Sequence, residues 1–184
     1  MKGRDHLEMA HSLEVMISAR RIRDRVKVLT QKLNQDFQGR DVVIIALLKG
    51  TVVFVADLIR GMEFPMRLDF MGVSSYGSKT QPGKLIVTQD LRIDIRGRHV
   101  LLVDDILDTG RTLYAVQGRL RRLQPASLRT CVLLDKRERR EKQVPVEYVG
   151  FQIPNRFVVG YGMDWDEHYR NLPHIGVVST AAQF

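Results

Sequence analysis

The sequence predicts one α/β domain built on a central, mainly parallel β-sheet that is flanked by helices. Residues 42–48 form an unbroken apolar run rich in β-branched side chains, which is typical of a strand buried on both faces. Residues 99–103, 111–123 and 128–134 follow one another as strand, helix and strand, and this order implies a right-handed βαβ crossover. A chain of 184 residues, 44% of them hydrophobic, is enough for one domain with its own core.

Helical spacing of apolar side chains identifies the helices. Residues 19–37 carry apolar side chains three and four positions apart, with Ser18 as the expected N-cap and Gly39 as the expected stop. Residues 52–62 are expected to form a second helix after the abrupt end of the first buried strand. The helix at residues 111–123 has an apolar stripe made of Leu113, Val116, Leu120 and Leu123.

Two further strands are predicted at residues 66–75 and 84–91. They flank a polar stretch at residues 76–83 that is rich in turn-forming residues. Composition allows this stretch to be either a mobile loop or an ordinary hairpin connection.

Cysteine content and hydropathy indicate the setting of the protein. Cys131 is the single cysteine and lies in an apolar run, so we expect a buried thiol, no internal disulfide and a reducing cytoplasm. The amino-terminal residues lack the apolar core of a signal peptide, and no apolar run approaches the roughly 20 residues of a membrane span. We therefore expect a cytoplasmic protein that does not enter a membrane.

The net charge of +8 favours anionic partners, which include nucleic acid, acidic lipid and polyphosphate substrates. Much of the excess lies in two clusters, residues 119–122 and residues 136–142. A solvated basic face would explain both clusters equally well. The charge by itself does not choose among these partners.

Polar dipeptides stand at the ends of three predicted strands. They are Lys49-Gly50, Asp104-Asp105 and Asp135-Lys136. In open α/β sheets ligands bind outside the carboxyl ends of the strands. If these strands are parallel, the three dipeptides line one crevice.

The central run, VDDILDTGRT at residues 103–112, suits a sugar phosphate with a metal ion. Two adjacent carboxylates are costly to desolvate unless a cation or hydroxyl groups compensate, and hydrated Mg²⁺ with ribose hydroxyls would supply both. The residues that open the following helix offer hydroxyls, backbone N–H groups and a helix N-terminus to an anion. They are Asp108, Thr109, Gly110, Arg111 and Thr112.

Simpler explanations account for less of this run. Helix capping needs a single Asp or Thr, whereas here three acids precede a Thr-Gly-x-Thr sequence. The Gly-x-x-x-x-Gly-Lys-Ser/Thr string of nucleoside triphosphatases is absent from the sequence. Asp108-Thr109-Gly110 matches an aspartic protease triplet, but two acids precede it and an amphipathic helix follows it.

The run at residues 103–112 resembles the phosphoribosyl pyrophosphate (PRPP) signature of type I phosphoribosyltransferases. The rest of the chain resembles the hypoxanthine-guanine phosphoribosyltransferases, with motifs in the same order from about residue 14 to residue 179. LLKG at residues 47–50 is similar to that family's pyrophosphate loop, and Ser75-Tyr76 stands where its mobile loop carries a Ser-Tyr pair. FVVGYGMD at residues 157–164 and YRNLP at residues 169–173 are similar to its base-binding segment.

The resemblance implies roles for the acids and for the phosphate-binding residues. Asp104 and Asp105 would hold the ribose hydroxyls directly and through Mg²⁺, although many family members have Glu-Asp at this place. Asp108 would be the general base near nitrogen 7 of the purine. The 5′-phosphate would bind at residues 108–112. Pyrophosphate would bind at Lys49, Gly50 and Arg170.

The resemblance also implies a purine site. Lys136 would donate to oxygen 6 of the base, Phe157 would stack on the ring, and Val158 would contact its edge through the backbone. Asp164 would face a second Mg²⁺. Without the resemblance, the sequence favours a place in the strand core for Phe157 and a surface position for Arg170. A cis peptide bond is expected between residues 48 and 49.

The implied protein is a Mg²⁺-dependent purine salvage enzyme that uses PRPP, a single domain over residues 1–184 with a hood from about 1–20 and 150–184. The family suggests homodimers or homotetramers. Two alternatives stay open. One is an enzyme of the same fold that prefers xanthine or a pyrimidine, and the other is a regulator of the same fold that binds RNA. The basic clusters lack the interleaved aromatic side chains that stack on bases, so we expect no nucleic acid partner.

Overall fold

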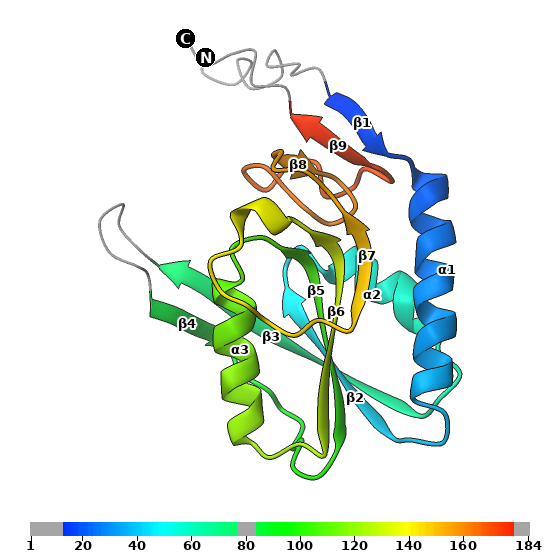
Figure 1. Ribbon diagram of the computed structural model, residues 1–184, viewed down its shortest axis with the longest axis vertical. Helices are drawn as coiled ribbons and strands as arrows, with labels where there is room; N and C mark the ends of the chain where they lie inside the picture. The colour runs from blue at the N-terminus through cyan, green and yellow to red at the C-terminus, as the bar shows by residue number, and fades with distance from the viewer. Residues whose placement is uncertain (1–12, 77–83, 179–184) are drawn as a thin grey trace, which may run out of the picture.

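The computed structural model describes residues 13–76 and 84–178, which form a six-stranded sheet, a smaller sheet and the helices that cover them (Figure 1). The central sheet has the strand order β4-β3-β2-β5-β6-β7. All its neighbouring strands pair in parallel except β4, which is antiparallel to β3. The strands are β2 (Val42–Leu48), β3 (Met66–Tyr76), β4 (Lys84–Gln89), β5 (His99–Leu107), β6 (Ser127–Asp135) and β7 (Tyr148–Gln152).

Strand β2 shows why an unbroken apolar run predicts a central strand. Successive side chains of a strand point to opposite faces. Val42, Ile44 and Ala46 belong to the core on one face of the sheet. Val43, Ile45 and Leu47 belong to the core on the other face. Both faces of this strand are therefore buried under other elements, as the sequence predicts.

The helices divide between the two faces (Figure 1). Helices α1 (Ala19–Asp36) and α2 (Val52–Ile59) pack on one face, and α3 (Arg111–Arg122) packs on the other. Ser18 accepts a hydrogen bond from the Arg21 backbone N–H, so it caps α1 as predicted. The helix ends at Asp36 rather than at residue 37, and Gly39 follows it with a φ of 69°.

A three-stranded antiparallel sheet joins the two ends of the described chain. Its order is β1-β9-β8, with β1 at Leu13–Ile17, β8 at Val158–Val159 and β9 at Ile175–Val178. Figure 1 shows it at the end of the molecule toward which β6 and β7 run. Val158 and Ile175 join the same core as α1 and α2, so this sheet packs onto the main body.

Some boundaries differ from the predictions. Strand β5 continues to Leu107, so Asp104 and Asp105 lie within a strand and not in a loop. Their hydrogen-bonded register with β6, which pairs Asp104 with Val132, extends the strand past its apolar part. Leu123 caps the end of α3 and is exposed instead of belonging to its buried stripe.

Several expectations concern residues outside or at the margin of the description. The predicted mobile loop falls mostly on residues 77–83, which lie outside the described residues. Ser75 and Tyr76 belong to the backbone of β3. Cys131 is buried and free, as expected. Within residues 13–76 and 84–178, no helix combines the length and the apolar character that crossing a bilayer requires.

Candidate active site

The parallel register brings the predicted strand ends to one edge of the sheet. Ala46 of β2 pairs with Val103 of β5, and Leu107 of β5 pairs with Asp135 of β6. A pocket of about 380 Å³ opens at this edge. Its lining comes from the ends of β2, β3 and β5 and from the start of α3, and comprises Leu47, Leu48, Gly50, Val73, Asp104, Asp105, Ile106, Leu107, Asp108, Thr109, Gly110, Thr112 and Leu113.

The acidic pair forms one side of this pocket. Asp104 is only 8% exposed, and its Oδ1 accepts hydrogen bonds from Thr51 Oγ1 at 3.3 Å and from the Asp105 backbone N–H at 3.0 Å. Burial, followed by the charge of Asp105, raises the pKa of Asp104 well above its usual value. Burial also raises the pKa of Asp105, while hydrogen bonds and the charge of Arg170 oppose the rise. Two desolvated carboxylates side by side favour a bound cation or hydroxyl donors.

The start of helix α3 forms the opposite side. Gly110 precedes the helix with a φ of 82° and has no side chain to cap it, while Thr109 Oγ1 accepts a long hydrogen bond of 3.4 Å from the Arg111 N–H. The N-terminal N–H groups and the helix dipole are therefore available to an anion. Thr109 and Thr112 add hydroxyl groups to the same wall.

A segment after β6 holds this loop in place. It includes the short 3₁₀ helix η1 (Arg137–Arg139). The backbone N–H groups of Glu141 and Lys142 donate to Thr109 O at 2.9 and 3.0 Å, and Arg111 pairs with Glu141. A Cβ at Gly110 would overlap Lys142 O, so this contact requires glycine.

The basic cluster at residues 136–142 is thus more than a solvated face. Lys136 is 6% exposed, and Arg140 is largely buried against the Asp135 carboxylate. Arg137 also pairs with Asp135, at 3.4 Å. The carboxylate of the third predicted dipeptide is therefore occupied by arginines, and Asp135 is not among the residues that line the pocket. Sequence reasoning missed these contacts, because charge composition does not show which cations fold inward.

Asp108 lines the pocket and lies near enough to Lys136 for their charges to interact. Asp108 Oδ2 pairs with Arg139 at 3.3 Å, while Oδ1 is buried and has no hydrogen-bond partner among the described residues. Burial lowers the pKa of Lys136, and the charge of Asp108 partly opposes this. A buried acceptor without a donor is costly in a folded protein. Asp108 is therefore suited to receive an N–H from a ligand.

The turn after β2 approaches both acids and the carboxyl-terminal loop. The peptide bond between Leu48 and Lys49 is cis, as the resemblance predicted. A Cβ at Gly50 would overlap the Asp105 carboxylate, and a Cβ at Gly162 would overlap Gly50 O. Close backbone approach at both glycines thus joins the turn, the acidic pair and the loop. The importance of Gly162 was not apparent from the sequence.

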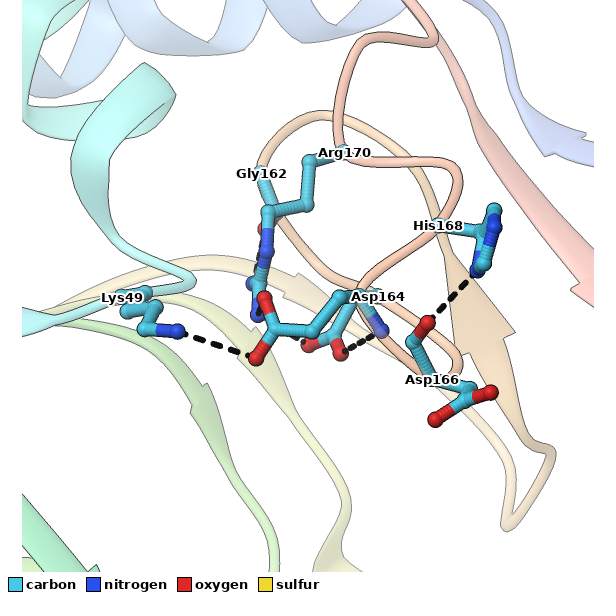
Figure 2. Close-up of polar contacts among 7 residues, drawn as sticks. Lys49, Gly162, Asp164, Asp166, His168 and Arg170 are labelled. Atoms are coloured by element: carbon cyan, nitrogen blue, oxygen red, sulfur yellow. Dashed lines mark hydrogen bonds and ion pairs between the residues drawn. The ribbon is translucent and has the colours of Figure 1, made fainter.

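The carboxyl-terminal loop carries an ion-pair cluster around Arg170 (Figure 2). Arg170 Nη1 donates to Gly162 O at 2.8 Å, and Nη2 lies 2.8 Å from Asp164 Oδ1 and 3.1 Å from Glu167 Oε2. Lys49 Nζ reaches Glu167 Oε1 at 3.0 Å. The predicted residues Lys49, Asp164 and Arg170 are therefore brought together, and Glu167, which the sequence reasoning missed, connects them. Its position three residues before Arg170 was the available signal.

The predicted base-stacking residue projects from the loop before β8. Phe157 is 51% exposed, so it is not the strand core that its sequence context suggested. Its ring makes an edge contact with Trp165, with the ring centres 6.3 Å apart. Val158 begins β8 and is buried.

The structure separates the acids that the sequence predicted as metal ligands into two places. Asp104 and Asp105 lie at the pocket, and Asp164 pairs with Arg170 in the loop. Across the described part of the chain, no cluster of three or more His, Cys, Asp or Glu side chains could hold a metal ion. The acidic pair still suits Mg²⁺, because this ion commonly takes one or two protein carboxylates and completes its shell with water and phosphate oxygens.

Known proteins resemble this chain over most of its length. A phosphoribosyl transferase domain model matches residues 16–166. The hypoxanthine phosphoribosyltransferase of Salmonella typhimurium is 45% identical over 173 residues, covering 92% of this chain and 97% of the relative. The hypoxanthine-guanine phosphoribosyltransferase of Streptococcus pneumoniae is 42% identical over 166 residues, covering 90% of this chain and 92% of the relative.

Solved structures agree with these matches. A hypoxanthine phosphoribosyltransferase from Staphylococcus aureus superposes with a TM-score of 0.89 at 39% identity, covering 93% of this chain and 94% of that one. A hypoxanthine-guanine phosphoribosyltransferase from Bacillus anthracis gives a TM-score of 0.85 at 42% identity, covering 90% and 97%. By sequence and by fold, the chain belongs to the phosphoribosyltransferase family, among its hypoxanthine and hypoxanthine-guanine phosphoribosyltransferases.

Proposed function

We propose that the protein transfers the 5-phosphoribosyl group of PRPP to hypoxanthine, guanine or both, giving the nucleoside monophosphate and pyrophosphate. The observation that carries this proposal is the pocket at the strand ends. It has a buried acidic pair on one side and an open helix N-terminus on the other, which suits a ribose 5-phosphate bound through both its hydroxyls and its phosphate.

The ribose end of the proposed complex rests on Asp104 and Asp105. Their carboxylates would accept the ribose hydroxyls and, together with substrate oxygens, would hold Mg²⁺. When bound, Mg²⁺ would neutralise charge on the diphosphate of PRPP. The 5′-phosphate would lie at residues 108–112, where Thr109, Thr112 and the first N–H groups of α3 can donate to it.

The purine end rests on Asp108 and Lys136. Asp108 Oδ1, which is buried and unpartnered in the described structure, would accept the proton from nitrogen 7 as nitrogen 9 bonds to the anomeric carbon and pyrophosphate leaves. Lys136 would donate to oxygen 6, and the exposed ring of Phe157 would stack on the base. These donors and acceptors favour a 6-oxopurine over uracil.

The leaving-group end rests on Arg170, Lys49 and the backbone of Gly50. Bond breaking at the anomeric carbon transfers negative charge to pyrophosphate, and these groups would stabilise it. Asp164 would stay next to Arg170 and face the second Mg²⁺ that the resemblance implies. Ser75 and Tyr76, which precede residues 77–83, would lie on the segment that covers the site during transfer.

The larger organisation is proposed on the same basis. We assign residues 1–184 to one phosphoribosyltransferase domain, with a hood from about 1–20 and 150–184 that includes the small sheet. The family suggests a homodimer or homotetramer, and small-angle scattering of the purified protein would decide the subunit number.

The proposal is tested by measuring nucleotide formation from PRPP with hypoxanthine, guanine, xanthine and uracil, each with and without Mg²⁺. We expect hypoxanthine or guanine to be the best substrate and the reaction to require Mg²⁺. Uracil as the best substrate would overturn the base assignment. Salt-sensitive RNA binding without pyrophosphate release would instead favour the RNA-binding alternative. Lys136 and Arg140 give this alternative little support, because Lys136 is buried and Arg140 is largely buried.

A further inference from the structure

The two cations assigned to pyrophosphate are already paired with a carboxylate of the protein itself. Glu167 reaches Lys49 Nζ through Oε1 at 3.0 Å and Arg170 Nη2 through Oε2 at 3.1 Å. Its carboxylate therefore bridges two cations that come from the turn after β2 and from the carboxyl-terminal loop. Figure 2 shows Lys49 reaching from the turn after β2 toward the loop that carries Arg170.

From this bridge we infer that Glu167 is an internal counter-anion, which occupies the cationic site when it is empty and is displaced by the diphosphate of PRPP or by pyrophosphate. The inference deepens the proposed function and rests on it. Glu167 is a positioning residue in this account, since it acts through Lys49 and Arg170 and takes no part in bond making.

The donor geometry of Arg170 shows that its Nη2 group is engaged by carboxylates of the protein. Nη1 donates to Gly162 O through one of its two N–H groups, and Nη2 contacts both Asp164 and Glu167. A diphosphate oxygen can take a hydrogen bond from Nη2 only if one carboxylate withdraws. The remaining nitrogen, Nε, is buried and has no partner within the described residues.

Burial indicates which carboxylate withdraws. Asp164 is 31% exposed, and its Oδ2 also accepts the Glu167 backbone N–H at 3.0 Å. The Glu167 side chain is 63% exposed, and among the described residues the two cations are its ion-pair partners. Exposed ion pairs are weak and exchange readily with other anions. Glu167 is therefore the carboxylate that leaves.

The charge state of Glu167 supports this role. Hydrogen bonds from Lys49, followed by those from Arg170, lower the pKa of Glu167, so its carboxylate is ionised at neutral pH. An ionised carboxylate at this place keeps anions that bind weakly from pairing with Lys49 and Arg170. It also gives them a partner to return to when pyrophosphate leaves.

The test compares Glu167→Gln with Asp166→Asn in the full-length protein. Both variants remove one negative charge from neighbouring positions, but the Asp166 carboxylate points away from Lys49 and Arg170 (Figure 2). Inorganic pyrophosphate is titrated into each protein in the presence of Mg²⁺, and heat release gives the Kd. We expect Glu167→Gln to tighten pyrophosphate binding by about threefold to tenfold relative to Asp166→Asn.

Steady-state kinetics provides a second measurement. Glu167→Gln should make pyrophosphate a stronger product inhibitor and should lower the KM for PRPP, with the KM for purine unchanged. Glu167→Asp, which keeps the charge, should return both values toward those of the unchanged protein. A purely structural role would move the purine KM as well.

Each outcome bears on the inference. Equal pyrophosphate affinity in the two variants overturns it, and so does weaker binding by Glu167→Gln, which would make Glu167 part of the loaded site. Pyrophosphate binding by Glu167→Gln alone would support the role of Glu167 as a counter-anion. If none of the proteins binds pyrophosphate, this role is overturned. Because the titration contains no purine, a failed purine assignment and a failed role for Glu167 give different results.

Discussion

The acidic pair of β5 and the carboxylate of Glu167 serve the same candidate site in opposite surroundings. Asp104 and Asp105 are buried on a central strand, where desolvation raises the pKa of both. Glu167 lies in an exposed loop, where two cations lower its pKa. Under the proposed function, the buried pair would hold the ribose, and the exposed carboxylate would give way to pyrophosphate.

The largest expected effect tests whether the buried end also performs chemistry. Asp108→Asn keeps an acceptor oxygen but cannot take a proton, so kcat should fall by about 10²–10⁴-fold while the KM for PRPP changes little. Steady-state kinetics with hypoxanthine and with guanine measures both values. Asp24→Asn, at an exposed carboxylate of α1, is the control, and a kcat for Asp108→Asn equal to that of the control would remove the base assignment.

The next prediction separates binding from stability at the acidic pair. Asp104→Asn keeps the oxygen that accepts from Thr51 and removes one of two repelling charges. PRPP binding with Mg²⁺ should weaken by about tenfold to a hundredfold, since bonds to a charged group are lost. In the free protein the free energy of unfolding should rise, because a buried charge that burial and Asp105 disfavour is removed. Calorimetry measures PRPP binding, and thermal unfolding measures the stability of the free protein. A variant that loses both PRPP binding and stability would contradict this prediction.

The stability gain of Asp104→Asn should depend on pH. Because the folded protein raises the pKa of Asp104, it binds this proton more tightly than the unfolded chain does. The stabilising contribution of the protonated form is present below the usual aspartate pKa and is lost as pH rises through the raised value. The Tm advantage of the variant should therefore be larger at about pH 8 than at about pH 5. An advantage that grows on acidification would show the opposite shift.

A smaller effect is expected at the purine end. Lys136→Met keeps most of the buried aliphatic stem and removes the donor, so the KM for purine should rise by about tenfold. Arg137→Met changes the adjacent, exposed cation and should leave this KM near its original value. The kinetic constants for purine and PRPP are measured separately for each variant. A change confined to PRPP would show that Lys136 does not meet the base.

The smallest effect tests the contact that joins the two ends. Gly162→Ala should lower the free energy of unfolding by about 1–2 kcal/mol, because its φ is 101° and a Cβ would overlap Gly50 O. Gly118→Ala, in α3 with open space around the new Cβ, should instead raise it by about 0.5–1 kcal/mol. Denaturant unfolding compares them. Equal changes would mean that the turn and the loop are not tightly docked.

Much of the fold follows from local patterns. The apolar run of β2, the helical spacing in α1 and the strand-helix-strand order around α3 predict their elements to within a few residues. The continuation of β5 through Asp104 and Asp105 was not predicted, because its cause is the pairing with β6 rather than the polarity of these residues. The small sheet also depends on pairing between distant segments, such as Leu13 with Val178.

For the candidate site, the sequence by itself determined which residues stand at the strand ends and that their carboxylates, hydroxyls and N–H groups suit a sugar phosphate. Only the tertiary structure decided how charge is distributed among them. Burial raises the pKa of Asp104, and folding places Lys136 and most of Arg140 in the interior. Asp108 Oδ1 has no hydrogen-bond partner among the described residues, while the carboxyl-terminal loop brings Glu167 to Lys49. Desolvation and ion pairing depend on distances between segments far apart in the chain, and local sequence does not contain these distances.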